Sequence, residues 1–424
     1  MSEVIATVSV RSPRAGIGVE VCFEFPGTGQ TVHLPLPDRG LLAEVRRKAG
    51  IYLERVVPLT ARLNAGTEQA ASALRILLNK GRELTALLVQ DDIERFLRLE
   101  SAFRAAWPRW RSADWSDDTA PLPMVELHCH DDTLPLELLP LFDFGPLPEL
   151  RTYADLAAAA SRFLGFATVV RRVVPTPVPA DRVLRNDPAL PVQFLRHRGL
   201  PSAQEEERFL ASLGGHVRVD GPWPVAQDEG EVRDALLRAL YDGSPLDGSA
   251  GTAPPVQVQH FACHCDTTAE LDDDYVLALS TRNGKARRLT FGELREGYYE
   301  RIFADGDSGG HRAVIILNAC ASSRTNPLTA YSFPRWFLNR GHRAFIGTET
   351  DVPDGVAAGF AAAFYGRLLE ARRPLGEAVV WARRDLLRDF RNPLGLLYVM
   401  YGDTQLTVER ARPGVYRASA GRAA

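Results

Sequence analysis

Several features that would assign a function directly are missing from this 424-residue chain. No apolar run approaches the roughly 20 residues that a membrane helix needs, and the amino terminus lacks the charged-then-apolar pattern of a signal peptide. The net charge is only −3, and basic residues alternate with acidic ones along the expected helices instead of forming a basic stripe. We therefore expect a cytoplasmic protein that binds neither membranes nor nucleic acid.

Cysteine is also scarce. The chain has five cysteines, an odd number, at positions Cys22, Cys129, Cys263, Cys265 and Cys320. Without a secretory signal, so few cysteines predict reduced thiols, which leaves one of them free for catalysis. The stretch 341–347 contains neither G-x-G-x-x-G nor the lysine of a phosphate-binding loop, and we expect no cofactor.

Alternating residues predict a small β-rich region at the amino terminus. Strands are expected over 4–10, 19–25 and 31–34, separated by glycine and proline turns. Asp38 can cap a helix over about Leu41–Leu63, in which apolar residues recur at helical spacing. We expect residues 1–70 to form a cap outside the main domain.

Strands and helices alternate regularly farther along the chain. Helices are expected over 67–89 and 92–106, followed by a strand over 124–129. From residue 191 onward, further strands are expected at 191–195, 216–219, 256–261, 275–279, 313–320, 343–346 and 396–401. Helices are expected between most of them, at 203–213, 229–241, 291–302, 328–339, 356–371 and 376–390.

This alternation predicts an α/β fold with a doubly wound, mostly parallel sheet flanked by helices. Hydrophobic residues make up 45% of the chain, enough for one large core or two to three ordinary ones. We divide the chain into the cap 1–70, an upstream half 71–185, a catalytic half 186–410 and a tail 411–424.

Two apolar segments about fifty residues apart end in reactive side chains. We read Val256–His264 and Ala313–Cys320 as buried strands that end in His264 and Cys320. The carboxyl ends of parallel strands meet at one edge of a sheet, so the imidazole and the thiol would point into one crevice. A thiol needs a base to become a thiolate, and the spacing therefore predicts a Cys/His nucleophilic site.

Other interpretations of these residues remain open. His260 would share the side of the strand with His264 and competes as the base, but it is more typical of a histidine at the edge of a core. Structural zinc is a second alternative, with the candidate ligands His128, His130, His260, Cys263, His264 and Cys265. The acidic run 266–274 lacks the alternating carboxylates and glycine of a calcium loop. We expect no metal.

Four motifs in one order resemble the CHAT domain, a caspase-like branch of cysteine peptidases related to separase. They are His260–His264, Leu317–Ser322, Phe337–Thr348 and Val352–Asp354, and the resemblance extends over roughly residues 75 to 405. It implies a caspase-hemoglobinase-like fold with His264 as the general base and Cys320 as the nucleophile. Family members usually have glycine after the histidine, where this chain has Cys265.

The resemblance also indicates further site residues. The backbone N–H groups of Cys265 and Cys320 would form the oxyanion hole. We place Asp351, Asp354 and His260 at the substrate pocket. A carboxylate there would favour arginine or lysine before the scissile bond, and an apolar preference remains the alternative.

These observations leave three classes of function. The first is an intracellular, regulated cysteine endopeptidase in a bacterial defence or programmed-death pathway, with a protein substrate and a regulatory partner or trigger, as the resemblance implies. The second is an inactive module that keeps the fold and binds a partner, suggested by Cys265 in place of glycine. The third is a zinc-stabilised interaction domain.

Overall fold

The computed structural model describes residues 2–11, 18–108, 115, 118–128, 134–141, 144–147, 149–174, 181–186, 189–223, 229–243, 255–268, 274–280, 286–305, 313–319 and 332–409. Cys320, the expected nucleophile, lies outside these residues. The same holds for Cys129, His130 and the tail 411–424.

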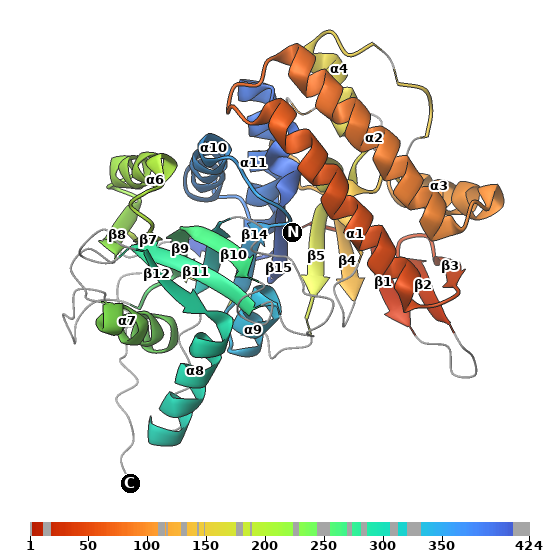
Figure 1. Ribbon diagram of the computed structural model, residues 1–424. Helices are drawn as coiled ribbons and strands as arrows, with labels where there is room; N and C mark the ends of the chain where they lie inside the picture. Colours follow the sequence, from red (N-terminus) through yellow and green to blue (C-terminus); the bar gives the residue numbers. More distant parts are fainter. Residues whose placement is uncertain are drawn as a thin grey trace.

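An 11-stranded sheet runs through the molecule in the order β3-β2-β1-β4-β5-β15-β14-β13-β9-β7-β8 (Figure 1). Its strands are β1 (Val4–Arg11), β2 (Val19–Phe25), β3 (Gln30–Leu36), β4 (Met124–His128), β5 (Val169–Val173), β7 (Leu190–Arg196), β8 (Val217–Trp223), β9 (Val258–Ala262), β13 (Val314–Asn318), β14 (Ala344–Thr348) and β15 (Tyr398–Gly402).

The sheet contains two parallel blocks that run in opposite directions, and β2 and β3 extend its edge in antiparallel pairing. Strands β1, β4, β5 and β15 are parallel and form the first block. Strands β14, β13, β9, β7 and β8 are parallel and form the second block. The blocks meet where β14 pairs antiparallel with β15. The predicted mostly parallel sheet is therefore confirmed, with a reversal of direction that the prediction did not include.

Helices cover both faces of the sheet. They are α1 (Arg39–Val56), α2 (Thr67–Val89), α3 (Ile93–Ala106), α4 (Tyr153–Ala160), α5 (Leu164–Ala167), α6 (Pro201–Ser212), α7 (Glu229–Asp242), α8 (Phe291–Asp305), α9 (Phe333–Asn339), α10 (Asp354–Tyr365) and α11 (Leu375–Phe390). Short helical turns are η1 (Val57–Thr60), η3 (Leu136–Leu138), η5 (Gly366–Glu370) and η6 (Pro393–Leu397).

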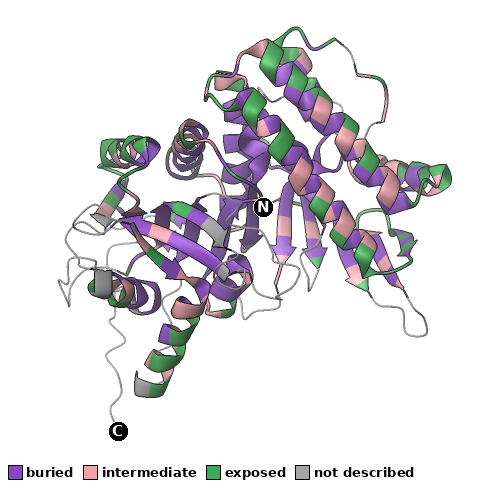
Figure 2. Ribbon diagram, viewed as in Figure 1, coloured by how far each residue is buried: buried purple, intermediate pink, exposed green. Residues whose placement is uncertain are grey.

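Successive side chains of β13 point alternately to the two helical layers that cover the sheet. Val314 and Ile316 belong to the core that contains α6, α10 and α11, whereas Ile315 and Leu317 belong to the core that contains α7, α8 and α9. Successive side chains of a strand point to opposite faces, so a strand buried on both faces is apolar throughout. Figure 2 shows this burial along the sheet, with exposed residues on the outer faces of α1 and α2.

The expectation that residues 1–70 form a cap outside the main domain is wrong for strands β1–β3. β1 pairs with β4 in parallel, so β1–β3 extend the main sheet instead of forming a sheet of their own. Phe23 and Phe25 pack edge-on against Phe103 of α3, within the large core that reaches as far as Val408. The amino-terminal region is thus an integral part of the α/β domain.

Local sequence signals explain where the amino-terminal helices begin and end. The Asp38 side chain accepts a hydrogen bond from the Leu41 N–H at 3.1 Å, as expected of an N-cap. The α-helix ends at Val56, earlier than the expected Leu63, because Pro58 has no N–H to continue the α-helical hydrogen bonds, and the chain goes on as the short turn η1. α2 has the predicted bounds and ends at Gln90, whose φ is 57°.

A three-stranded antiparallel sheet follows β9 directly. It contains β10 (His264–Thr268), β11 (Asp274–Ser280) and β12 (Ala286–Thr290). The expected single strand Val256–His264 is therefore wrong: β9 ends at Ala262, the chain bends at Cys263, and His264 begins β10. A two-stranded pair, β6 (Val183–Arg185) with β16 (Thr407–Glu409), completes the described strands.

None of the helices in the described ranges combines the length and hydropathy needed to cross a membrane.

Candidate active site

Strands β9 and β13 of the second block end at the same edge of the sheet. They are adjacent and parallel, with Ala262 opposite Asn318. His264 comes two residues after the end of β9 in the sequence, and Cys320 comes two residues after the end of β13. That the imidazole and the thiol meet at this edge stays a prediction.

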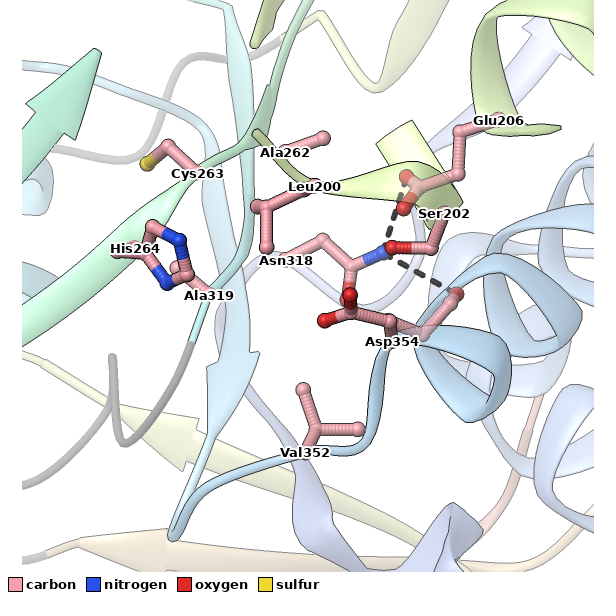
Figure 3. A pocket seen from close by; sticks show the side chains of 11 residues that line it. Leu200, Ser202, Glu206, Ala262, Cys263, His264, Asn318, Ala319, Val352 and Asp354 are labelled. Carbon is pink, nitrogen blue, oxygen red and sulfur yellow. Dashed lines mark hydrogen bonds between the residues drawn. The ribbon is translucent and has the colours of Figure 1, made fainter. Parts of the chain in front are cut away.

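A small cleft lies at this edge (Figure 3). It is lined by Leu200, Ser202, Glu206, Ala262, Cys263, His264, Asn318, Ala319, Val352, Asp354 and Ala357. These residues come from α6 and the residue before it, from the end of β9 and the start of β10, from the end of β13, and from the start of α10 and the segment before it. Cys320 is outside the described residues, but Ala319, which precedes it, lines the same cleft as His264.

His264 and His260 lie in different environments. His264 is exposed at the cleft, whereas His260 is fully buried in β9. The Nε2 atom of His260 is 2.6 Å from Glu206 Oε2, and its Nδ1 atom is 3.0 Å from the Tyr365 hydroxyl. His260 is thus a core histidine with both ring nitrogens engaged, and its expected place in the substrate pocket is corrected.

A buried polar network connects this histidine to the nucleophile strand. Asn318 donates from Nδ2 to Glu206 Oε2 at 3.0 Å and to the Ala357 carbonyl at 3.1 Å. Its Oδ1 accepts from the Tyr398 hydroxyl at 2.6 Å. Figure 3 shows the bond between Asn318 and Glu206 as a dashed line. Both the nitrogen and the oxygen of the Asn318 amide group are hydrogen-bonded, and these bonds fix the end of β13.

The charge state of this network follows from its burial. Burial, and then the nearby Glu206 carboxylate, raise the pKa of Tyr365 well above its ordinary value, so its hydroxyl stays protonated. A protonated hydroxyl can donate to Nδ1 of His260, while Nε2–H donates to Glu206. Each hydrogen bond in this chain then has one donor and one acceptor, as buried polar groups require.

A threonine on the neighbouring strand fixes the residue before Cys320. The Thr348 hydroxyl, fully buried in β14, donates to the Ala319 carbonyl at 2.7 Å. The end of β13 is therefore bound from the α6 side through Asn318 and from the β14 side through Ala319. Both contacts act on the two residues directly before Cys320.

Cys265 lies within β10, opposite Leu277 of β11. Its side chain is buried in the core that contains α7 and α8. The backbone there is extended, and Cys265 is not among the described residues with positive φ, so this position does not require glycine. The replacement of glycine by Cys265 thus causes no backbone strain, and its role as an oxyanion donor stays a prediction.

The two aspartates expected at the substrate pocket differ in position. Asp354 lies in the first turn of α10, is exposed, and lines the cleft. Asp351 is exposed as well but does not line the cleft, whereas the buried Val352 does. Of the three residues assigned to the pocket from the sequence, Asp354 alone contributes to the cleft.

A model of the CHAT domain matches residues 149–411, well over half of the chain. The chain belongs to the CHAT domain family. The match begins later than the residue 75 at which we placed the resemblance, so β1–β4 of the shared sheet precede the matched CHAT domain.

A probable protease and two separase structures are similar to this CHAT chain. The chain is 33% identical over 232 residues to a probable protease of Vitiosangium sp. (strain GDMCC 1.1324), a match that covers 48% of this chain and 28% of that protein. Two crystal structures of the Saccharomyces cerevisiae separase–securin complex align with 96% of this chain and 30% of theirs, at 11% and 9% identity and TM-scores of 0.42. The chain spans less than a third of the length of these proteins.

Sequence reasoning missed Glu206, a buried carboxylate that lines the cleft. Glu206 is 2% exposed, on a helix that was predicted correctly at 203–213 apart from its first turn. The available signal was its spacing: Ala203, Glu206 and Leu210 recur at helical intervals and share the buried face. A carboxylate on the apolar face of a helix requires a buried partner, which His260 and Asn318 supply.

The zinc alternative has no geometric support in the described part of this CHAT chain. Within the described residues, no group of three or more His, Cys, Asp or Glu side chains is placed to hold a metal ion. His260 is bonded through both ring nitrogens, and Cys263 and Cys265 are buried thiols. Two of the proposed ligands, Cys129 and His130, lie outside the described ranges.

Proposed function

We propose that this chain is a cysteine endopeptidase in which Cys320 is the nucleophile and His264 is its general base. The observation that supports this most strongly is that one cleft is lined both by His264 and by Asn318 and Ala319, the two residues before Cys320. The thiol and the imidazole would then meet at the edge of the second block. Membership of the CHAT family and the similarity to a probable protease support the same reaction.

The proposed reaction proceeds through a thioester. His264 takes the proton of the Cys320 thiol, and the thiolate attacks the scissile carbonyl carbon. The backbone N–H groups of Cys265 and Cys320 donate to the oxyanion that develops on the carbonyl oxygen. The C–N bond then breaks, and His264 returns the proton to the leaving amine. Water, deprotonated by His264, hydrolyses the thioester and regenerates the thiol.

The cleft provides a candidate determinant of substrate preference. Asp354 is an exposed carboxylate in its lining, and a charge-assisted pair with arginine or lysine would favour substrates with a basic residue before the scissile bond. Replacement by asparagine keeps the shape and removes the charge. In the Asp354→Asn variant, we expect kcat/KM for Arg-terminated fluorogenic peptides to fall relative to Leu-terminated ones. An unchanged ratio would favour the apolar alternative.

Substitutions of the dyad test the proposal directly. Cys320→Ala should abolish hydrolysis of Arg-, Lys- and Leu-terminated peptides, and His264→Ala should reduce kcat at least about 100-fold. Cys22→Ala, a buried cysteine in β2, and His216→Ala, an exposed histidine before β8, serve as controls and should keep activity. If Ser322→Ala silences the enzyme and Cys320→Ala does not, the nucleophile is assigned wrongly.

The protein substrate, a cytoplasmic location and a role in bacterial defence belong to the same proposal, as the family resemblance implies. A peptidase of this kind needs restraint, so we expect weak basal activity that a partner or trigger increases. This is tested on the full chain with and without cell extract, because β1–β3 form part of the main sheet and cannot be removed like a lid. High activity of the purified chain, unchanged by extract, would contradict the expected latency.

A binding module without catalysis is the second candidate, because Cys265 replaces the glycine that follows the histidine in most family members. A peptidyl electrophile separates the two. The peptidase proposal predicts covalent labelling of Cys320 that is lost in His264→Ala, whereas a binding module would show no labelling that depends on His264.

A further inference from the structure

A second histidine is held beside His264. His197 follows the end of β7, and its backbone N–H donates to the carbonyl of Ala262, the last residue of β9, at 2.8 Å. The next N–H, of Arg198, donates at 2.6 Å to the hydroxyl of Ser280, the fully buried last residue of β11. The loop is therefore attached to the two strands that flank His264, since β9 precedes it and β11 pairs with it.

This attachment brings the two imidazole rings into contact. Their centroids are 4.9 Å apart and the ring planes are inclined by 65°, an edge-to-face arrangement. His264 is exposed, and its imidazole has no hydrogen-bond partner within the described part of the chain. A surface histidine without such a partner can occupy several rotamers, and a ring packed on one side reduces that freedom.

The local geometry determines the tautomer of His197. The Gly199 N–H donates to Nδ1 of His197 at 3.1 Å, so Nδ1 is an acceptor and the proton of the neutral ring is on Nε2. Burial, and then a charge on His264, lower the pKa of His197 below its ordinary value. The lowered pKa favours the neutral form of His197, and a neutral ring beside His264 avoids two adjacent positive charges.

Gly199 is a necessary part of this arrangement. A Cβ atom at position 199 would lie 2.9 Å from Cε1 and 3.0 Å from Nδ1 of the His197 ring, too close for either to remain in place. The tight turn and the ring position thus depend on each other.

We propose that His197 is a positioning residue for the peptidase dyad: its ring packs against His264 and holds that imidazole in the orientation that accepts the thiol proton. The inference rests on the proposed function, because it assigns His264 as the base. His197 itself does not touch the substrate or the reacting atoms in this role.

Two substitutions separate the ring contact from the shape of the loop. In His197→Asn, the side-chain oxygen can replace Nδ1 as the acceptor for Gly199 N–H, so the loop is kept and the ring is lost. We expect kcat to fall on the order of tenfold, the equivalent of one aromatic pair, with KM changed less than about twofold. In His197→Phe, the ring is kept and the acceptor is lost. Here we expect the larger change in KM, because Leu200 and Ser202 of the same segment line the cleft.

Gly199→Ala provides a third variant, in which both ring and acceptor remain but the ring is displaced. We expect its kcat to fall as in His197→Asn. A His197→Asn enzyme with the kcat and KM of the unmodified enzyme would overturn the proposal.

A measurement independent of activity separates this proposal from the peptidase assignment. In the Cys320→Ala protein, the imidazole signals of His264 are compared by NMR with and without His197→Asn, and the exposed His216 serves as the reference. The ring contact predicts that the His264 signals move and the His216 signals do not. Unmoved His264 signals overturn the positioning role alone. Moved signals in a chain that never hydrolyses peptides overturn the peptidase function, and the positioning role with it.

Discussion

The two parallel blocks of the sheet use buried polar groups in different ways. In the first block, buried charges pair with one another and with backbone carbonyls. In the second block, buried polar side chains converge on strand ends beside a cleft. The comparison shows how one α/β architecture can be rigid in one half and have a reactive edge in the other.

Arginines connect the helices to the strands in the first block. Arg172 of β5 binds Glu137 through both of its terminal nitrogens, one of them at 2.6 Å from Oε2, and both side chains are 2% exposed. Arg383 of α11 donates to the carbonyls of Gly165 and Tyr398 at 2.5 Å each. These contacts join α11, α5 and η3 to the sheet.

The corresponding contacts in the second block act on the chain near the predicted nucleophile. Glu206 accepts from His260 and Asn318, and Thr348 binds the Ala319 carbonyl. Loss of a contact in the first block should therefore affect stability alone. Loss of a contact in the second block should affect stability and catalysis together.

The largest effect is expected for Glu137→Gln, which leaves Arg172 buried with a neutral partner. We expect the free energy of unfolding to fall by about 3–5 kcal/mol, because a buried charge loses its counterion. Chemical denaturation measures this loss. Glu126→Gln in β4 is the matched control, since its pair with Arg171 is 17% exposed on both sides and should contribute less than about 1 kcal/mol.

The same residue predicts the pH dependence of stability. Burial alone would raise the pKa of Glu137, but Arg172 and Arg383 lower it below the ordinary value. A carboxyl whose pKa is depressed by folding stabilises the protein above its unfolded pKa of about 4.3, and this contribution is lost as the pH falls below that value. Stability of the unmodified chain should therefore fall more steeply in acid than that of Glu137→Gln. Parallel curves would contradict the assignment.

Glu206→Gln should have a smaller effect on stability and a larger one on activity. Hydrogen bonds to a charged acceptor are stronger than those to a neutral amide, so we expect a loss of about 1–3 kcal/mol. Because Asn318 then loses its charged partner, kcat should fall as well. Hydrolysis assays at a temperature where the variant is fully folded, together with denaturation curves, check both parts. Unchanged kcat in a destabilised Glu206→Gln protein would remove the proposed difference between the blocks.

Two buried threonines give the sharpest comparison. Thr348→Val removes the bond to Ala319, and Thr168→Val in the first block removes an equivalent bond to the Leu164 carbonyl at 3.0 Å. Both hydroxyls are fully buried and valine has nearly the same shape, so each variant should lose about 1 kcal/mol. Only Thr348→Val should lower kcat. Equal kcat values in the two variants would show that the Ala319 contact has no catalytic role.

The smallest effect is expected where the amino-terminal region meets the cleft. Arg46 of α1 lies 3.4 Å from Glu349, which begins the segment leading to Val352 and Asp354. The pair is partly exposed, so Arg46→Gln should cost less than about 1 kcal/mol in stability. We expect KM to rise by no more than about fivefold, with kcat unchanged. Steady-state kinetics tests whether α1 holds the segment with Val352 and Asp354 in place.

Local signals in the sequence were sufficient for most helices and strands of this fold. The capping residue Asp38 placed the start of α1 to within two residues, and α2 has its predicted bounds. Pairings between distant segments could not be predicted in this way. The parallel pairing of β1 with β4 joins residues more than 100 positions apart, and neither strand carries a pattern that specifies its neighbour.

The same limit applies to the candidate site. The motifs predicted which edge of the sheet carries the reactive residues, but the apolar alternation continues through Cys263 and concealed the bend before His264. His260 lies in the large sheet and His264 in the three-stranded sheet. The assumption that both side chains point to the same side of one strand was therefore wrong. Glu206 and His197 come from neighbouring elements: the packing of α6 brings Glu206 to the cleft, and the loop after β7 brings His197 against His264.

The position of β15 determines when this molecule can become functional. It is the last strand of the described large sheet along the chain, yet it lies between β5 and β14, where the first block meets the second. During synthesis, the other strands of both blocks emerge from the ribosome before β15, which joins them. A long stretch of chain separates β5 from β15, so bringing these two strands together is slow. The unpaired edges of the strands remain exposed until residue 402 has been added. Assembly of the sheet therefore ends with its centre, and a nascent chain cannot complete this sheet before residue 402 has been made.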